Sequence, residues 1–325
     1  MPCYNGEQVL PELLRRTRQV FAAEKIEDFE LILVDDGSTD GTAEQIGNAC
    51  KEDERVIGVF LSRNYGHQLA LTAGLQYSNG DRVRVLDADL QDPPEMLGRM
   101  MARLNEGYDV VYGKRRERDG ETRFKNTTAH LFYRALHRLV DIELPTDTGD
   151  FRLMSRRVTD MLQSMPEKDR FIRGLVSWIG LRQTYVEYER EARFAGDSKY
   201  PLSSMLKLAV DAFTGISIKP LRLASVCGLS NGFRRIAARR TRSLRLHGRK
   251  YRSRLDITDV GCPCYWSHTD GSHRHCGEYL GRLYIQSKDR QLFIVDHVIG
   301  GDEQTELPTA LVPTLPIARK SPSRR

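Results

Sequence analysis

Three segments in the first hundred residues repeat one order: a run of apolar residues, a polar turn, and a stretch with helical periodicity. The first is FELILVDDGSTDGTAEQI (29–46), the second begins with RVIGVFLSRN (55–64), and the third is DRVRVLDADLQDPPEML (81–97). Apolar runs that end in turn residues are typical of buried strands, and Pro93 and Pro94 are typical of a helix start. Alternating strands and helices predict a doubly wound α/β sheet with ligands at the carboxyl ends of its strands.

The third turn carries two carboxylates, Asp87 and Asp89, directly after its apolar strand. From the end of a strand, both can point out of the sheet edge toward one hard cation, and Gln91 offers a further oxygen. Mg²⁺ or Mn²⁺ held in this way keeps open coordination positions and neutralises a diphosphate. An acidic turn also occurs as a solvated loop or a helix cap, so the pair alone does not establish a metal site.

The first turn carries a second acidic pair, Asp35 and Asp36, at an equivalent strand end. Its carboxylates can accept hydrogen bonds from a base or a ribose. The alternative is helix capping, for which Ser38, Thr39 or Asp40 would be sufficient.

The region after the third segment is less regular. YDVVYGKR (108–115) predicts a further strand, and residues 125–140 predict a helix. The acidic turn TDTGDFRLMSRR (146–157) precedes another predicted helix, which begins near Ser155.

Six segments follow one another in the order PCYNGEQVL, LVDDGSTDGT, LSRNYGHQLALTAGL, LDADLQDPPE, DTGDFRLMSR and RFAGDSKY. Together they resemble the family 2 glycosyltransferases of GT-A fold that load a sugar onto a polyprenyl phosphate. Within that family the chain is most similar to the bacterial undecaprenyl-phosphate glucosyltransferases, with dolichyl-phosphate mannose synthases as more distant members. The resemblance covers residues 1 to about 225, and the number and order of its motifs make it specific.

The resemblance implies a role for individual residues in this chain. A nucleotide sugar would be held by Pro2, Tyr4, Asn5, Glu7, Asp36, Ser38, Arg63, Asn64 and Asp87. The metal and the sugar diphosphate would be bound by Asp87, Asp89 and Gln91, and phosphate by Arg193, Ser198 and Lys199. Asp89 and Asp150 would be the catalytic residues.

The implied reaction also defines what basic residues would do. A lipid monophosphate is already an anionic nucleophile near neutral pH, so its attack on a sugar needs positioning and charge neutralisation more than a strong base. Because two anions must approach each other, we expect phosphate contacts from Lys114, Arg115 and Arg123 as well; each of these residues could instead be a solvated surface cation.

Two residues have alternative interpretations at this stage. Asp150 could orient the sugar or the acceptor, assist proton removal, or cap the helix near Ser155. His67 has the chemistry of a general base, but it begins a predicted helix, so we expect a capping or structural role.

The chain departs from the family pattern at both ends. An apolar strand is expected before Pro2, yet Met1 directly precedes it, which predicts that the first strand is missing. After a juxtamembrane segment at 201–226, the family continues into two membrane helices and a GEYLGRLY-like segment. Here an irregular, basic, Cys/His-rich region at 227–276 occupies the place of that membrane hairpin.

This region contains GCPCYWSHTDGSHRHC (261–276), whose cysteines and histidines are zinc-ligand types, and an arginine-rich run at 230–254. The cysteine and histidine spacing matches no common zinc site, and the arginine run has few interleaved aromatic residues and no recognisable nucleic-acid module. Reading the codons one nucleotide later would turn many of these residues into apolar ones. We therefore interpret Cys227 to Cys276 as the product of two compensating frameshifts, a hypothesis that the coding DNA sequence tests.

The overall charge fits a polyanionic or membrane-surface partner: the net charge is +6 and the isoelectric point is near 9.0. No run reaches the roughly 18 apolar residues that a membrane-spanning helix needs. The resemblance places the enzyme at the cytoplasmic membrane face, and the missing hairpin predicts a peripheral or soluble chain. No nucleic-acid partner is expected, and a homo-oligomer is left open.

The sequence therefore predicts a metal-dependent, inverting hexosyltransferase of GT-A fold with a mixed sheet. Its donor would be a nucleotide sugar, most simply UDP-glucose, and its acceptor a polyprenyl phosphate. The alternatives are an inactive remnant or a basic nucleic-acid or metal-binding protein. The predicted divisions are a catalytic domain at 1–200, the segments 201–226 and 227–276, a cytosolic segment at 277–299, and a disordered tail at 300–325.

Overall fold

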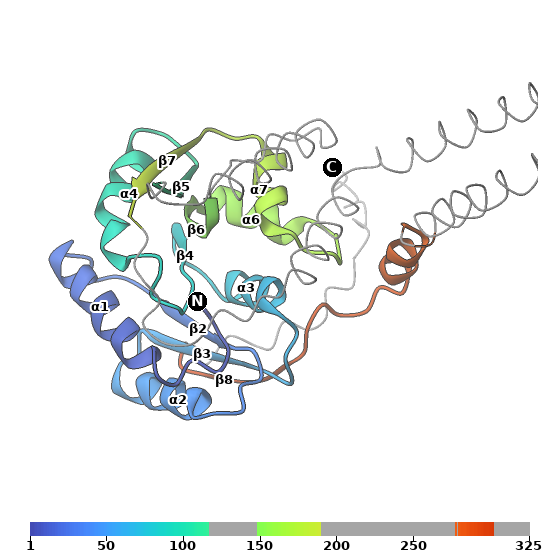
Figure 1. Cartoon of the computed structure of the whole chain (residues 1–325), viewed down its shortest axis with the longest axis horizontal. Helices are drawn as coiled ribbons and strands as arrows, with labels where there is room; N and C mark the ends of the chain where they lie inside the picture. Colours follow the sequence, from blue (N-terminus) through green and yellow to red (C-terminus); the bar gives the residue numbers. More distant parts are fainter. Residues whose placement is uncertain (117–147, 190–276, 278, 302–325) are drawn as a thin grey trace, which may run out of the picture.

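The computed structural model describes residues 1–116, 148–189, 277 and 279–301 (Figure 1). Its strands are β1 (Pro2–Cys3), β2 (Leu31–Asp35), β3 (Val56–Leu61), β4 (Arg82–Val85), β5 (Val110–Arg115), β6 (Thr148–Ser155), β7 (Gln183–Tyr188) and β8 (Val295–Ile299). Its helices are α1 (Leu10–Ala23), α2 (Thr42–Glu52), α3 (His67–Gln76), the 3₁₀ turn η1 (Pro94–Met96), α4 (Leu97–Asn105), α6 (Arg156–Ser164) and α7 (Ile172–Ile179).

The first sheet has the strand order β1-β2-β3-β8. Strands β1, β2 and β3 pair in parallel, and β8 is antiparallel to β3. Because parallel neighbours end at the same edge of a sheet, the turns after Cys3, Asp35 and Leu61 are brought together. This edge is where the sequence places its predicted nucleotide contacts.

The second sheet has the order β4-β6-β5-β7. Strand β6 is antiparallel to both β4 and β5, and β7 is parallel to β5. Val85, the last residue of β4, pairs with Arg152 of β6. Continuing this register by two residues brings Asp87 level with Asp150, which explains how two acidic turns far apart in the sequence come to share one site.

Both faces of the first sheet are covered by helices. Along β2, Leu31 and Leu33 belong to a hydrophobic cluster with α1, whereas Ile32 and Val34 face a second cluster that contains Ala70 of α3. This alternation is the burial pattern of a doubly wound sheet. The first cluster also contains side chains of the second sheet, so the two sheets share one core. The predicted α/β class with mixed strand directions is confirmed.

The start of the chain corrects one prediction. The first strand is not missing: Pro2 and Cys3 pair with Val34 and Asp35 of β2, and the amino group of Met1 donates a hydrogen bond to the Ile32 carbonyl. Strand β1 is two residues long, and the turn that follows it bonds to the turn after β2 through Asn5.

The predicted start of the helix after β2 is also shifted. Helix α2 begins at Thr42 with Gly41 at its N-cap, a residue that has no side chain to cap the helix. Of the predicted caps, only Asp40 contacts Thr42, by accepting bonds from its amide (3.1 Å) and its hydroxyl (2.5 Å).

Several predicted segments lie outside the described residues: the helix at 125–140, the segments 201–226 and 227–276, and the tail from 302 onward. Among the residues that are described, no helix is long and apolar enough to cross a membrane. Residues 279–287 are helical, and β8 then returns to the first sheet beside β3 (Figure 1). The segment 277–299 thus contributes a strand to the first sheet.

Candidate active site

The turn after β4 is held by a half-buried arginine. Arg84 donates hydrogen bonds to the carbonyls of Pro93 (3.1 Å) and Pro94 (2.7 Å), and its burial lowers the pKa of the guanidinium to about 10. Within the turn, Leu90 is buried and has a φ of +56°, a conformation that non-glycine residues adopt only under strong constraint. The turn therefore presents Asp87 and Asp89 on a fixed backbone.

Asp87 has an excess of negative charge around it. Its Oδ1 lies 3.5 Å from Nε2 of His67 and, among the described residues, makes no hydrogen bond. Burial raises the pKa of Asp87 to about 6; the nearby His67 opposes this shift, and the carboxylates of Asp150, Asp92 and Asp89 add to it. A buried carboxylate oxygen without a donor is a suitable ligand for a cation.

The residues at this turn fit a divalent metal shared with a substrate. Asp87 and Asp89 supply two carboxylates, and the backbone amide of Gln91 donates to Asp89 Oδ1 at 3.1 Å, which orients that group. In the described part of the chain, no three His, Cys, Asp or Glu side chains are grouped to hold a metal alone. Mg²⁺ and Mn²⁺ commonly take one or two protein carboxylates and complete their shell with substrate phosphates and water. Asp87, Asp89 and Gln91 would hold such an ion together with a diphosphate.

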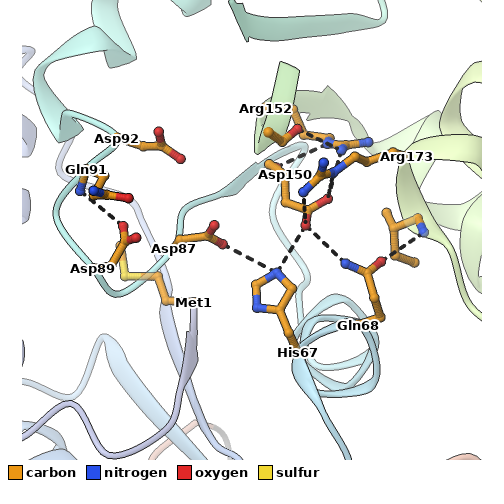
Figure 2. A network of polar contacts seen from close by, with 12 residues as sticks. Met1, His67, Gln68, Asp87, Asp89, Gln91, Asp92, Asp150, Arg152 and Arg173 are labelled. Carbon is orange, nitrogen blue, oxygen red and sulfur yellow. Dashed lines mark hydrogen bonds and ion pairs between the residues drawn. The ribbon is translucent and has the colours of Figure 1, made fainter. Parts of the chain in front are cut away.

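Asp150 lies across from Asp87 at the centre of a polar network (Figure 2). Its side chain is 1% exposed. Oδ1 accepts hydrogen bonds from Arg152 Nη2 (3.1 Å) and Arg173 Nε (3.0 Å). Oδ2 accepts from Gln68 Nε2 (3.0 Å) and Arg173 Nη2 (3.1 Å), and lies 3.1 Å from His67 Nε2. Gln68 in turn accepts from the Ile172 amide at 3.0 Å, which connects α3 to the start of α7.

This network makes Asp150 a very weak base. Burial alone would raise its pKa, but the hydrogen bond with His67 and the charges of Arg173 and Arg152 hold the pKa far below its usual range. A carboxylate with this many donors does not readily take a proton from a substrate. The capping alternative is wrong, because α6 begins at Arg156 after Ser155 and Asp150 bonds to other elements.

Of the capping or structural role predicted for His67, the structure does not show capping. His67 is the first residue of α3, with Gly66 at the N-cap and no capping hydrogen bond from a side chain. Its imidazole instead lies between the two acidic turns, 3.1 Å from Asp150 and 3.5 Å from Asp87. The histidine therefore bridges the two sides of the site.

The predicted nucleotide turn is tied to the turn after β2. Asn5, with a φ of +48°, accepts a hydrogen bond from the Thr39 amide (2.9 Å) and donates its own amide to the Ser38 hydroxyl (3.0 Å). The Glu7 carboxylate accepts from the Gly41 amide at 3.0 Å. Pro2 is buried within β1, whereas the ring of Tyr4 is 52% exposed and available for stacking on a base.

The second acidic pair supports the loop after β3. Asp36 is buried and accepts hydrogen bonds from the amides of Tyr65 (2.7 Å) and Gly66 (2.9 Å). Gly37, with a φ of +66°, approaches the loop so closely that a Cβ would lie 2.6 Å from the Arg63 carbonyl carbon. Arg63 and Asn64 are exposed beside this contact. In the structure Asp36 thus orders the loop that carries them.

Of the residues predicted to contact phosphate, the structure describes Lys114 and Arg115. Arg115 lies 3.6 Å from Asp92, and its Nε donates to the hydroxyl of Tyr188, which itself donates to Asp92. The Lys114 ammonium lies over the ring of Tyr185, 4.7 Å from its centroid. Arg123, Arg193, Ser198 and Lys199 lie outside the described residues.

Sequence reasoning missed three members of the network: Gln68, Arg152 and Arg173. Arg152 follows Asp150 at strand spacing, so its presence on the same face was open to prediction. Arg173 sits in the segment FIRGLVSW on a short helix, and nothing in the sequence connects that helix to Asp150.

Comparison with known proteins is consistent with these features. The family model described as "Glycosyl transferase family 2" matches residues 1–162. An uncharacterized glycosyltransferase of Bacillus subtilis is 44% identical over 92% of this chain and 93% of its own length. A protein of Shigella phage SfV named bactoprenol glucosyl transferase is 32% identical over 91% of this chain and 96% of its own.

Among solved structures, the chain is similar to glucosyl-3-phosphoglycerate synthase from Mycobacterium tuberculosis. The TM-score is 0.42 and the identity 21%, over 70% of this chain and 78% of that one. The assignment rests instead on the relatives, which match the chain over nearly its full length. The chain belongs to glycosyl transferase family 2.

Proposed function

We propose that this glycosyltransferase moves a glucosyl residue from UDP-glucose to a polyprenyl phosphate, with inversion at the anomeric carbon. The observation that carries the proposal is the arrangement around Asp87: an acidic turn suited to a metal diphosphate on one side, and an arginine-rich network on the other (Figure 2). The relatives named bactoprenol glucosyl transferase support glucose as the sugar and a polyprenyl phosphate as the acceptor.

The reaction has a simple balance. An oxygen of the acceptor phosphate attacks the anomeric carbon, a new C–O bond forms, and the bond between that carbon and the UDP oxygen breaks. UDP leaves with the electron pair, and the lipid product is a phosphodiester. A single displacement of this kind inverts the configuration, and the phosphate dianion has no proton to lose.

The residues of the chain supply positioning and charge. The turn around Asn5 and the exposed ring of Tyr4 would hold the nucleotide, since both lie at the edge where β1 and β2 end. A bound Mg²⁺ or Mn²⁺ would stabilise the negative charge on the leaving diphosphate. Asp87 and Asp89 would hold that ion, and Asp150 would act as a fixed anion rather than as a base.

The proposed place of the reaction is the cytoplasmic face of a membrane, because the acceptor is a lipid while the donor is a water-soluble nucleotide sugar. The positive net charge of the chain supports association with an anionic lipid surface.

The test is transfer by the full chain with Mn²⁺, a donor panel of UDP-glucose and GDP-mannose, and a polyprenyl phosphate, with the product identified by mass spectrometry. We expect a glucosyl lipid from UDP-glucose. Asp89→Asn should lower the rate by at least about 100-fold, equivalent to about 2.7 kcal/mol of transition-state stabilisation.

Asp160→Asn is the matched control. It removes one carboxylate from an exposed position on α6, where Asp160 lies 3.7 Å from Arg156 and makes no other ion pair with a described residue, and it should leave the rate unchanged. Transfer that is equally fast in Asp89→Asn would contradict the assignment of the acidic turn, and the absence of any glucosyl lipid with the wild-type chain would contradict the function.

A further inference from the structure

Arg173 has a geometry that its contact with Asp150 does not fully explain. Its Nε and Nη2 chelate the two carboxylate oxygens of Asp150, at 3.0 and 3.1 Å. This bidentate contact fixes the plane of the guanidinium. Within the described residues, the hydrogen bonds of Arg173 use only Nε and Nη2, so the guanidinium edge that carries Nη1 can meet a ligand.

The ion pairs of Asp150 also indicate that an anion can bind at Arg173. Arg152, whose side chain is fully buried, already pairs with Asp150 at 3.1 Å and balances its charge. Arg173 adds a second cation to the same carboxylate, and its side chain is 43% exposed. Asp150 is thus shared by two arginines, and Arg173 is the exposed one of the two, so it is the cation that an anion can approach.

The position of Arg173 relative to Asp87 indicates which anion this is. Figure 2 shows Met1, Asp89 and Gln91 on one side of Asp87, and Asp150 with Arg173 on the other. Met1 leads directly into the turn predicted to hold the nucleotide. In a single displacement the nucleophile and the leaving group lie on opposite sides of the reacting carbon, so an anion at Arg173 approaches from the side expected of the nucleophile.

We propose that Arg173 binds the phosphate of the acceptor and that Asp150 serves to hold Arg173 in place. This assignment rests on the proposed function and adds a residue and a subsite to it. Arginine suits the task because its planar fork can chelate Asp150 with one edge and bind phosphate oxygens with another, whereas a lysine ammonium offers a single point of contact.

The test is direct binding to the full chain, measured by calorimetry in the presence of Mn²⁺. The probes are geranyl phosphate, geraniol and UDP-glucose, and the variants are Arg173→Gln and Arg173→Lys. Arg157→Gln is the matched control, since it removes one positive charge from an exposed position on α6. Thermal unfolding of each variant shows whether it is folded. If Arg173→Gln does not fold, the binding of geranyl phosphate by Arg173→Lys, which retains the charge, tests the proposal.

We expect both Arg173 variants to bind geranyl phosphate more weakly, by at least about tenfold for Arg173→Gln and less for Arg173→Lys. UDP-glucose should bind all variants with affinities within about twofold of the wild type, and Arg157→Gln should match the wild type for every probe. Geraniol should bind weakly to all proteins, since it lacks the phosphate.

Two results would overturn the proposal. One is unchanged binding of geranyl phosphate by both Arg173 variants; the other is a selective loss of UDP-glucose binding, which would assign Arg173 to the donor diphosphate. These outcomes are separate from the proposed function. Arg173-dependent binding of geranyl phosphate without glucosyl transfer would reject only the function, and transfer that is unaffected in Arg173→Gln would reject only the role of Arg173.

Discussion

The carboxyl group of Asp150 shows how the surroundings of one residue decide its chemistry. From the sequence, Asp150 could be a base, an orienting group or a helix cap. In the structure its two oxygens face two arginines, a glutamine and a histidine, and the side chain is 1% exposed. A base needs a free lone pair and a proton affinity near that of its substrate, and Asp150 has neither.

Asp150→Asn should therefore destabilise the fold itself. Asparagine has the same shape but no charge, so it leaves the buried guanidinium of Arg152 without its counterion. Losing one partner of a buried ion pair costs about 3–5 kcal/mol. Chemical denaturation of Asp150→Asn beside the exposed-site control Asp160→Asn measures this cost. A variant as stable as the wild type but inactive would instead favour the role of a base.

His67 gives a prediction in the pH dependence of stability. Burial opposes protonation of His67, but its hydrogen bond with Asp150 and the charges of Asp87 and Asp150 raise its pKa above the ordinary value. A raised folded-state pKa adds stability that is fully present below the unfolded pKa of about 6.5 and is lost as pH rises through the folded pKa.

We therefore expect wild type and His67→Gln to differ more in Tm at pH 6 than at pH 9, when measured in EDTA so that no divalent cation competes for Asp87. A difference that stays constant, or that grows toward pH 9, would show that protonated His67 does not stabilise the site.

At the scale of secondary-structure elements, the site depends on how closely turns approach one another. The turn after β2 and the loop after β3 meet at Gly37, where the backbone has a φ of +66° and no room for a Cβ beside Arg63. Asp36, the preceding residue, fixes the same loop by accepting the amides of Tyr65 and Gly66. The geometry of the predicted nucleotide contacts at 63 and 64 is thus set by this contact between elements.

Gly37→Ala should disturb both stability and donor binding. The left-handed conformation costs an alanine about 1–2 kcal/mol, and the close approach to Arg63 adds to that cost. Gly80→Ala is the matched control, because its nearest contact, at 3.6 Å, is an ordinary one. Tm and UDP-glucose affinity should both fall in Gly37→Ala only. Equal effects in the two variants would show that the turn tolerates a side chain.

The elements themselves were largely predictable, and the contacts between them were not. The apolar runs ending at Asp35 and Leu61 mark β2 and β3 in the sequence, because strands buried on both faces need continuous apolar residues, whereas β4 alternates Arg and Val. The antiparallel register that brings Asp150 level with Asp87 is a long-range pairing and leaves no local signal. For the same reason Arg173 was missed and the contacts of His67 were not predicted: their partners lie on other elements.

At the scale of the whole molecule, one core supports both halves of the site. The largest hydrophobic cluster joins Leu33 of the first sheet to Leu153 of the second, so the nucleotide edge and the Asp150 network are held on one framework. Strand β8 adds a segment from near the end of the described chain to the same framework, with Val298 paired to Val59. A rigid framework is what a reaction between two anions requires, because their positions must be fixed against repulsion.

The central claim is that two anions react at this site, with the lipid phosphate as the nucleophile. The most direct measurement compares transfer of radiolabelled glucose from UDP-glucose to undecaprenyl phosphate and to undecaprenol, by the full chain with Mn²⁺. We predict label in the lipid fraction only with the phosphate and only when Mn²⁺ is present. Label transferred equally to undecaprenol, or transfer that persists in EDTA, would contradict the account.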